Sequence, residues 1–113
     1  MKDDRLYLIH TRECIARIEQ YTAEGREVFF ADTRTQDAVL RNLQTLAEST
    51  QRLSGDLKVA HPEVDWRGIS GVRNILVHNY LGINLVRIWE IVERDLPVLK
   101  DQIDMLLRSQ ENG

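Results

Sequence analysis

The sequence predicts an all-α protein, an up-and-down bundle of four or five helices. Apolar residues recur at helical spacing along nearly the whole chain, and no stretch shows the apolar–polar alternation of a strand. The connections between the periodic stretches are short, as in antiparallel bundles. A length of 113 residues allows one hydrophobic core, so we expect a single domain over 1–113.

The first half of the chain contains two clear helical patterns. The first runs from about Asp3 to Tyr21, and Gly25 can adopt the left-handed backbone that often ends a helix. The short apolar run 28–31 could add one helical turn, although it is too short for its period to decide. The strongest pattern spans Thr35 to Leu53 without proline or glycine, and we expect Gly55 to close it.

The third helical pattern follows a connector. Residues 56–65 carry no clear period, so we predict a loop there, with Asp65 capping the next helix. That helix is expected from about Trp66 to Asn79, and Gly82 should stop it.

The last amphipathic pattern covers about 84–108 and contains Pro97. Proline is poorly tolerated inside a helix but is compatible with a first turn. We therefore predict a break before Pro97, with Asp95 as the cap of a final helix.

Composition narrows the class of protein. Apolar residues make up 42% and charged residues 29% of the chain, which is typical of a globular domain. No apolar run approaches the roughly 20 residues needed to span a bilayer, and Met1 leads directly into charged residues. We therefore expect a cytoplasmic, unprocessed protein without membrane contact. A net charge of −3 argues against nonspecific coating of nucleic acid, although a local basic cleft remains compatible with it.

The single cysteine, Cys14, lies on the apolar stripe of the first helix. It cannot form an internal disulfide, and no Cys/His spacing resembles a zinc site. We predict a buried structural thiol and expect neither a metal nor a cofactor.

The stretch WRGISGVRNILVHNYLG, 66–82, concentrates polar groups on one helix. At 100° per residue one face is apolar and is expected to meet the core: Ile69, Val72, Ile75 and Leu76. Asn74 and His78 are stacked on the opposite face, and Gly71 leaves the helix surface bare close to His78. Arg73 lies about 140° around the helix from His78, within reach of a group held there.

These side chains suit RNA cleavage by a 2′-hydroxyl. An imidazole moves protons near neutral pH, and a guanidinium offers paired donors to phosphate oxygens. His78 would transfer the proton, Arg73 would stabilise the charge that develops on phosphorus, and Asn74 would orient one of them. The spacing of these residues alone favours an ordinary solvated helix face over a catalytic one.

The wider sequence around the motif adds information. Residues 73–80, RNILVHNY, match an Arg-x4-His-x-Tyr pattern, and the chain resembles the HEPN ribonucleases (higher eukaryotes and prokaryotes nucleotide-binding), specifically the HepT-like branch. The resemblance extends over 36–54, 64–84 and 86–103, in the expected order.

This resemblance implies a metal-independent endoribonuclease toxin of a toxin–antitoxin module. It implies an all-helical fold and a homodimer that brings two motifs to one cleft, so that one His78 acts as base and the other as acid. The implied partner is a minimal nucleotidyltransferase antitoxin, MntA-like, which attaches AMP to the motif tyrosine. By position that residue is Tyr80. An alternative is a HEPN subunit that binds nucleotides or a partner without cutting RNA.

Other polar residues carry weaker hypotheses. Arg41 and Glu48 lie seven residues apart on one helix face and could line the cleft with Gly71, although ordinary solvent-facing charges explain them equally well. His10 lies at the edge of the first apolar face, where a packed histidine is favoured over a catalytic one.

Overall fold

The computed structural model describes the backbone of residues 3–112 and the side chains of residues 3–110. Over this range the chain is helical and contains no strand. Its helices and helical turns are, in order, α1 (Asp4–Tyr21), α2 (Arg26–Ala31), α3 (Thr33–Gln51), α4 (Gly55–Ala60), α5 (Trp66–His78), η1 (Tyr80–Gly82), α6 (Leu85–Glu90), a π-helical turn η2 (Ile91–Asp95) and α7 (Leu96–Asn112).

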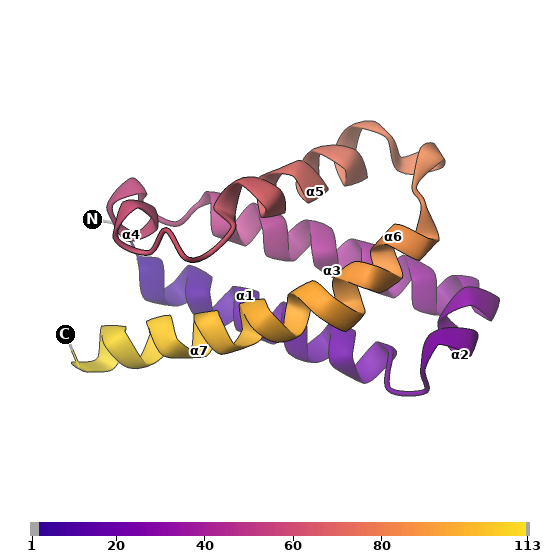
Figure 1. The fold of residues 1–113 in the computed structure, drawn as a ribbon, viewed down its shortest axis with the longest axis horizontal. Helices are drawn as coiled ribbons and strands as arrows, with labels where there is room; N and C mark the ends of the chain where they lie inside the picture. Colours follow the sequence, from indigo (N-terminus) through magenta and orange to yellow (C-terminus); the bar gives the residue numbers. More distant parts are fainter. Residues whose placement is uncertain (1–2, 113) are drawn as a thin grey trace.

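The long helices α1, α3, α5 and the continuous α6–η2–α7 segment form the bundle (Figure 1). Helix α1 packs against both α3 and α7, while α5 packs mainly against α3. In Figure 1, α5 lies above α3 and diverges from α6 toward its C-terminal end. The prediction of an all-α bundle is therefore confirmed.

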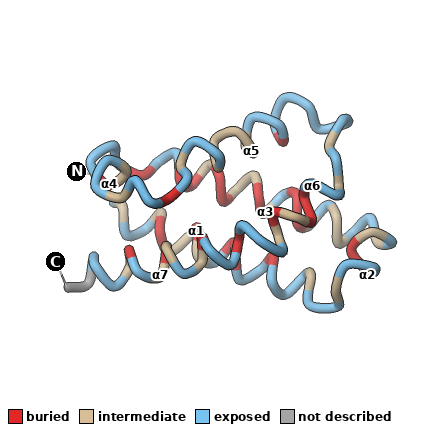
Figure 2. Tube along the Cα trace, in the orientation of Figure 1, coloured by how far each residue is buried: buried red, intermediate tan, exposed pale blue. Residues whose placement is uncertain are grey.

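The hydrophobic core lies along the inner faces of α1, α3 and α7 (Figure 2). Its completely buried members include Leu8, Ile15 and Ile18 of α1, Val39 of α3 and Ile103 of α7. The short run 28–31 is part of α2. This helix brings Phe29 into the core against Trp89, with ring centroids 5.3 Å apart. One buried aromatic side chain thus holds this short helix on the bundle.

Helix α5 begins as predicted because Asp65 caps it. The Asp65 carboxylate accepts a hydrogen bond from the backbone N–H of Gly68 at 2.9 Å. A Cβ on Gly68 would collide with this carboxylate. The capping aspartate and the glycine three residues later therefore depend on each other to start the helix.

The predicted loop over 56–65 is partly wrong, and so is the role of Gly55. Helix α3 already ends at Gln51, and Gly55 starts α4. The Ser54 hydroxyl caps α4 by accepting from the backbone N–H of Leu57 at 3.1 Å, and it donates to Asp4 at 2.7 Å. This capping bond and the burial of Leu57 stabilise α4, although the segment is too short to show a helical period in the sequence.

The predicted break at Asp95 is also wrong. The chain stays helical through η2, where the backbone N–H of Leu96 donates to Ile91 five residues earlier. A π-helical turn widens the helix locally, which makes room for Pro97, whose ring would otherwise clash with the preceding turn. Asp95 therefore lies inside a helical segment and caps nothing.

Two smaller expectations need correction. Gly25 has a positive φ of 96°, but it precedes α2 and does not close α1, which ends at Tyr21. Ile75 was expected in the core, yet it is 48% exposed, whereas its neighbour Leu76 is 2% exposed. Helix α5 therefore buries a narrower face than its apolar pattern suggests, because α6 does not close over the side that carries Ile75.

We expect the substitution Asp65→Ala to lower the free energy of unfolding by about 1 kcal/mol, since it removes an N-cap acceptor. Chemical denaturation monitored by circular dichroism measures this loss. Asp65→Asn is the matched control, because its carboxamide oxygen retains the acceptor. An alanine variant as stable as the asparagine variant would contradict the assigned cap.

Candidate active site

The Arg-x4-His-x-Tyr motif lies where α5 ends. The helix stops at His78 because Asn79 adopts a non-helical backbone with φ −140° and ψ 44°. Asn74 and His78 are exposed on α5, and Tyr80 is 49% exposed in the turn η1. The motif is therefore open to a large ligand such as RNA.

Arg73 is half-buried on a flank of α5. Its Nε is buried and has no hydrogen-bond partner, and no carboxylate forms an ion pair with the guanidinium among residues 3–110. A buried donor without a partner is costly. Arg73 thus carries a charge that a phosphate could compensate through paired hydrogen bonds.

The motif residues are not joined to one another within one chain. No hydrogen bond links Arg73, Asn74 and His78 in the part of the chain that the structure describes. Asn74 and His78 share a face, whereas Arg73 projects about 140° away from His78 around the helix. A single chain therefore presents separate polar groups, which a substrate or a second chain would have to bring together.

The turn after the motif is shaped by a glycine. The backbone N–H of Gly82 donates to the Asn79 carbonyl at 3.1 Å, which closes η1 around Tyr80. A Cβ on Gly82 would lie 2.8 Å from Asn79 Oδ1. Glycine at this position lets the Asn79 carboxamide lie directly against the turn.

A groove of about 390 Å³ separates α5 from α6, and we call it the motif groove. Gly71, Ile75 and Asn79 line it from the α5 side. Ile83, Asn84, Arg87 and Ile88 line it from the α6 side. A Cβ added to Gly71 would meet nothing within 4 Å, so this glycine leaves open space in the groove.

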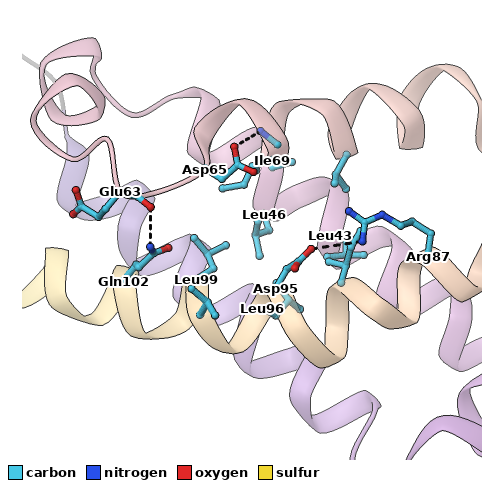
Figure 3. Close-up of a pocket in the computed structure, with 15 residues that line it drawn as sticks. Leu43, Leu46, Glu63, Asp65, Ile69, Arg87, Asp95, Leu96, Leu99 and Gln102 are labelled. Carbon is cyan, nitrogen blue, oxygen red and sulfur yellow. Dashed lines mark hydrogen bonds and ion pairs between the residues drawn. The ribbon is translucent and has the colours of Figure 1, made fainter.

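A second groove of about 400 Å³ adjoins the first and lies between α5 and α7 (Figure 3). We call it the acidic groove. Leu43 and Leu46 of α3 form part of its floor, and Asp65 and Asp95 contribute carboxylates to its lining, whereas Glu63 contributes its backbone carbonyl (Figure 3). The two grooves share Gly68, Val72, Arg87 and Ile91, so they form one channel along α5.

Charge distinguishes the two ends of this channel. The pKa of Glu63 is lowered by a hydrogen bond from its own backbone N–H and by His61, but this carboxylate points away from the groove (Figure 3). In the acidic groove the Arg87 guanidinium lies 3.8 Å from Asp95, while Gln102 donates to the Glu63 carbonyl at 3.1 Å (Figure 3). Two carboxylates, Asp65 and Asp95, face this groove against the one guanidinium of Arg87, so an anion is disfavoured there relative to the motif.

The weaker sequence hypotheses are placed as follows. Gly71 lines the motif groove, whereas Arg41 and Glu48 of α3 line neither groove. Arg41 is exposed, and Glu48 is half-buried beside Gln44. His10 is half-buried with Nδ1 3.1 Å from the Ser49 hydroxyl, which fits a packed histidine.

Sequence reasoning missed three polar residues that line the motif groove: Asn79, Asn84 and Arg87. Asn79 could have been noticed because it stands between the histidine and the tyrosine of the motif. No sequence pattern links Arg87 to the motif, because it reaches the groove from another helix. Only the packing of α6 beside α5 brings it there.

Cys14 is completely buried, and desolvation raises the pKa of its thiol, as expected for a structural cysteine. Among residues 3–110, no three His, Cys, Asp or Glu side chains are grouped as metal ligands. No helix in the described part of the chain is long and apolar enough to cross a membrane.

An all-helical bundle that exposes an Arg-x4-His-x-Tyr motif at a helix end defines a HEPN-like protein. The model of the ribonuclease HepT-like family matches residues 11–106, so the chain belongs to this family. No solved structure matched the chain.

Named relatives agree with this assignment. The chain is 37% identical over 101 residues to "Probable ribonuclease HepT" of Thermococcus cleftensis, covering 88% of this chain and 92% of that protein. It is 32% identical over 112 residues to "Putative RNase TTE0752" of Caldanaerobacter subterraneus, covering 98% and 100%.

A third relative is longer. The chain is 35% identical over 103 residues to "Gamma-glutamylcyclotransferase and putative RNase MJ0434" of Methanocaldococcus jannaschii. The match covers 90% of this chain and 46% of that protein, so this chain spans about half of its length. Family membership and these names together support a ribonuclease activity.

Proposed function

We propose that this chain is a metal-independent endoribonuclease that acts as the toxin of a toxin–antitoxin module. The observation that carries the proposal is the exposed His78 at the open end of α5, on the same helix as the unpaired Arg73. The HepT-like family supplies the substrate class, which is RNA.

The proposed reaction needs only groups that the motif provides. The neutral imidazole of His78 takes the proton of a ribose 2′-hydroxyl, whose oxygen attacks the adjacent phosphorus. The bond between phosphorus and the 5′-oxygen breaks, and that oxygen receives a proton, which leaves a 2′,3′-cyclic phosphate and a 5′-hydroxyl. Arg73 donates to the phosphate oxygens as charge develops on them, and Asn74 orients the reacting groups.

A homodimer would complete the site. Arg73 and His78 point to different sides of α5, so a second copy can supply the guanidinium that one chain places away from its own imidazole. It also supplies a second His78, so that one histidine acts as base and the other as acid. Exposed apolar side chains near His78 favour an interface there: Val77 is 39%, Tyr80 49% and Leu81 101% exposed.

The proposed regulation acts on Tyr80. A minimal nucleotidyltransferase antitoxin, MntA-like, would attach AMP to this phenol, which is half exposed at the end of the motif. The added phosphodiester carries negative charge and bulk. It would compete with the RNA phosphate for Arg73 and obstruct the approach to His78.

The second candidate is a subunit that binds a nucleotide or a partner without cutting RNA. It is favoured by the absence of any hydrogen bond between Arg73 and His78 over the described residues. A purified dimer that binds nucleotides and leaves RNA intact would support this alternative.

Substitution of either reactive residue should abolish toxicity. We expect His78→Ala and Arg73→Ala to lower the rate of RNA cleavage by about 10²- to 10⁴-fold, because each removes a group that acts in the transition state. Cleavage of a labelled RNA and growth of expressing cells measure the effect. Arg67→Ala is the matched control, since Arg67 is also an arginine of α5 but is exposed and lies outside the motif. Equal cleavage by all four proteins would exclude the proposed mechanism.

The dimer proposal predicts that a charge introduced among the exposed apolar residues prevents dimer formation. We expect Leu81→Glu to give a monomer with much reduced cleavage, because it places a carboxylate in the proposed interface. Sedimentation velocity gives the oligomeric state. Val59→Glu is the control, since Val59 is 82% exposed on α4, at the other end of α5 from the motif. A Leu81→Glu dimer with parental activity would rule out this interface.

Measurement of the intact mass of the protein tests the proposed regulation through Tyr80. We expect co-expression with an MntA-like nucleotidyltransferase to increase the mass of the chain in AMP units, while Tyr80→Phe abolishes the increase because it lacks the acceptor oxygen. The unmodified phenylalanine variant should stay toxic in the presence of the antitoxin. Modification that persists in Tyr80→Phe would show that another residue is the target.

A further inference from the structure

We propose that the motif groove holds a nucleobase of the RNA substrate, from a nucleotide next to the scissile phosphate. The groove would then select which base stands at the cleavage position. This inference rests on the proposed ribonuclease function and adds to it a binding site for one base.

The position of the groove relative to His78 supports this inference. Gly71 and Ile75 line the groove and precede His78 by seven and three residues, which places all three on neighbouring lines of α5. Asn79, which follows His78 directly, also lines it. A nucleotide whose phosphate lies against His78 can therefore turn its base into this groove.

The walls of the groove suit a flat aromatic ring. Ile75 of α5 stands on one side, and Ile83 and Ile88 stand on the other. Gly71 leaves open space at the helix surface, so a ring can approach the backbone of α5. The volume of about 390 Å³ lies within the range of small-molecule sites, and splayed bases are commonly held between apolar side chains.

Polar groups with free hydrogen-bonding capacity line the same space. The Asn79 carboxamide forms no hydrogen bond in the described part of the chain, so both its donor and its acceptor are available. Asn84 uses its Oδ1 to accept from the backbone N–H groups of Val86 and Arg87, at 2.9 and 3.3 Å, which leaves its NH₂ free. Two amides that line one groove can recognise the edge of a base.

Arg87 adds a guanidinium to the lining of the groove. Its nearest carboxylates, Glu90 and Asp95, lie 3.7 and 3.8 Å away, which is too far for strong hydrogen bonds. Both carboxylates pair with Nη1, so Nε and Nη2, which form no hydrogen bond among residues 3–110, remain available for acceptor atoms of a base, such as O6 and N7 of guanine.

The adjoining acidic groove disfavours the entry of a phosphate into the motif groove and thereby favours a base there. Asp65 and Asp95 line the channel beyond Arg87 and would repel a phosphate that entered more deeply. The uncharged base avoids this repulsion. The phosphates would remain outside the motif groove, near His78.

Gly71→Leu tests the inference, because its side chain would fill the groove while leaving the motif residues unchanged. The substitution should not destabilise the helix, since glycine inside a helix costs about 1 kcal/mol relative to alanine and the space is open. Thermal unfolding checks this. Gly55→Leu is the matched control, because a Cβ at Gly55 also meets nothing within 4 Å and lies outside both grooves.

The readout is the ratio of two kcat/KM values. One is measured with an RNA that the parent cuts, and the other with the same RNA lacking the base of the nucleotide next to the scissile phosphate. For the parent we expect the intact RNA to be preferred by about tenfold or more, given the usual contribution of one stacked base. Gly71→Leu should bring this ratio close to one, whereas Gly55→Leu should keep the parental ratio. Asn79→Ala should change which of the four bases is preferred.

A crosslinking experiment separates failure of this inference from failure of the proposed function. RNA carrying 4-thiouridine in place of every uridine is irradiated with the His78→Ala variant, and crosslinks are mapped by mass spectrometry. Crosslinks within 71–91 that disappear when Gly71→Leu is added support the groove, even if the parent proves unable to cut RNA. Cleavage by the parent together with an unchanged base ratio and crosslinks in Gly71→Leu would overturn the groove while leaving the ribonuclease intact.

Discussion

Helix α5 rests on α3 along a narrow line of apolar side chains, and the arrangement of the whole site depends on that contact. Leu76 is almost completely buried at this line, whereas Ile75 beside it is half exposed. A helix held along one line leaves its two flanks free. One flank presents Arg73, and the other opens into the channel between α5 and α6.

This arrangement places unlike chemical environments along one helix. The start of α5 adjoins carboxylates that line the acidic groove, while its end carries Arg73 and His78 without a neutralising carboxylate among residues 3–110. An anionic ligand is therefore favoured at the motif end and repelled at the other. The field of the channel would thus give an RNA strand a direction, with phosphates outside near His78 and uncharged groups within.

Much of the fold could be predicted because its signals are local. The Asp65 cap and the long period of α3 involve neighbouring residues only, and the structure agrees with both apart from small shifts in the ends of α3. Expectations failed where the deciding interaction leaves no mark on the local pattern of apolar residues. Helix α4 depends on the bond between Ser54 and Asp4, fifty residues earlier, and Pro97 is accommodated by a π-helical turn rather than a break.

The sequence by itself determined the class of fold, the start of α5 and the order of the motif residues along one helix. Tertiary structure alone decided that Ile75 is exposed and that Asn79 and Arg87 meet across a groove. The physical reason is that helical periodicity assigns each residue to a face but does not state which face a neighbouring helix covers. That depends on how α5 diverges from α6 (Figure 1), a property of the packed bundle as a whole.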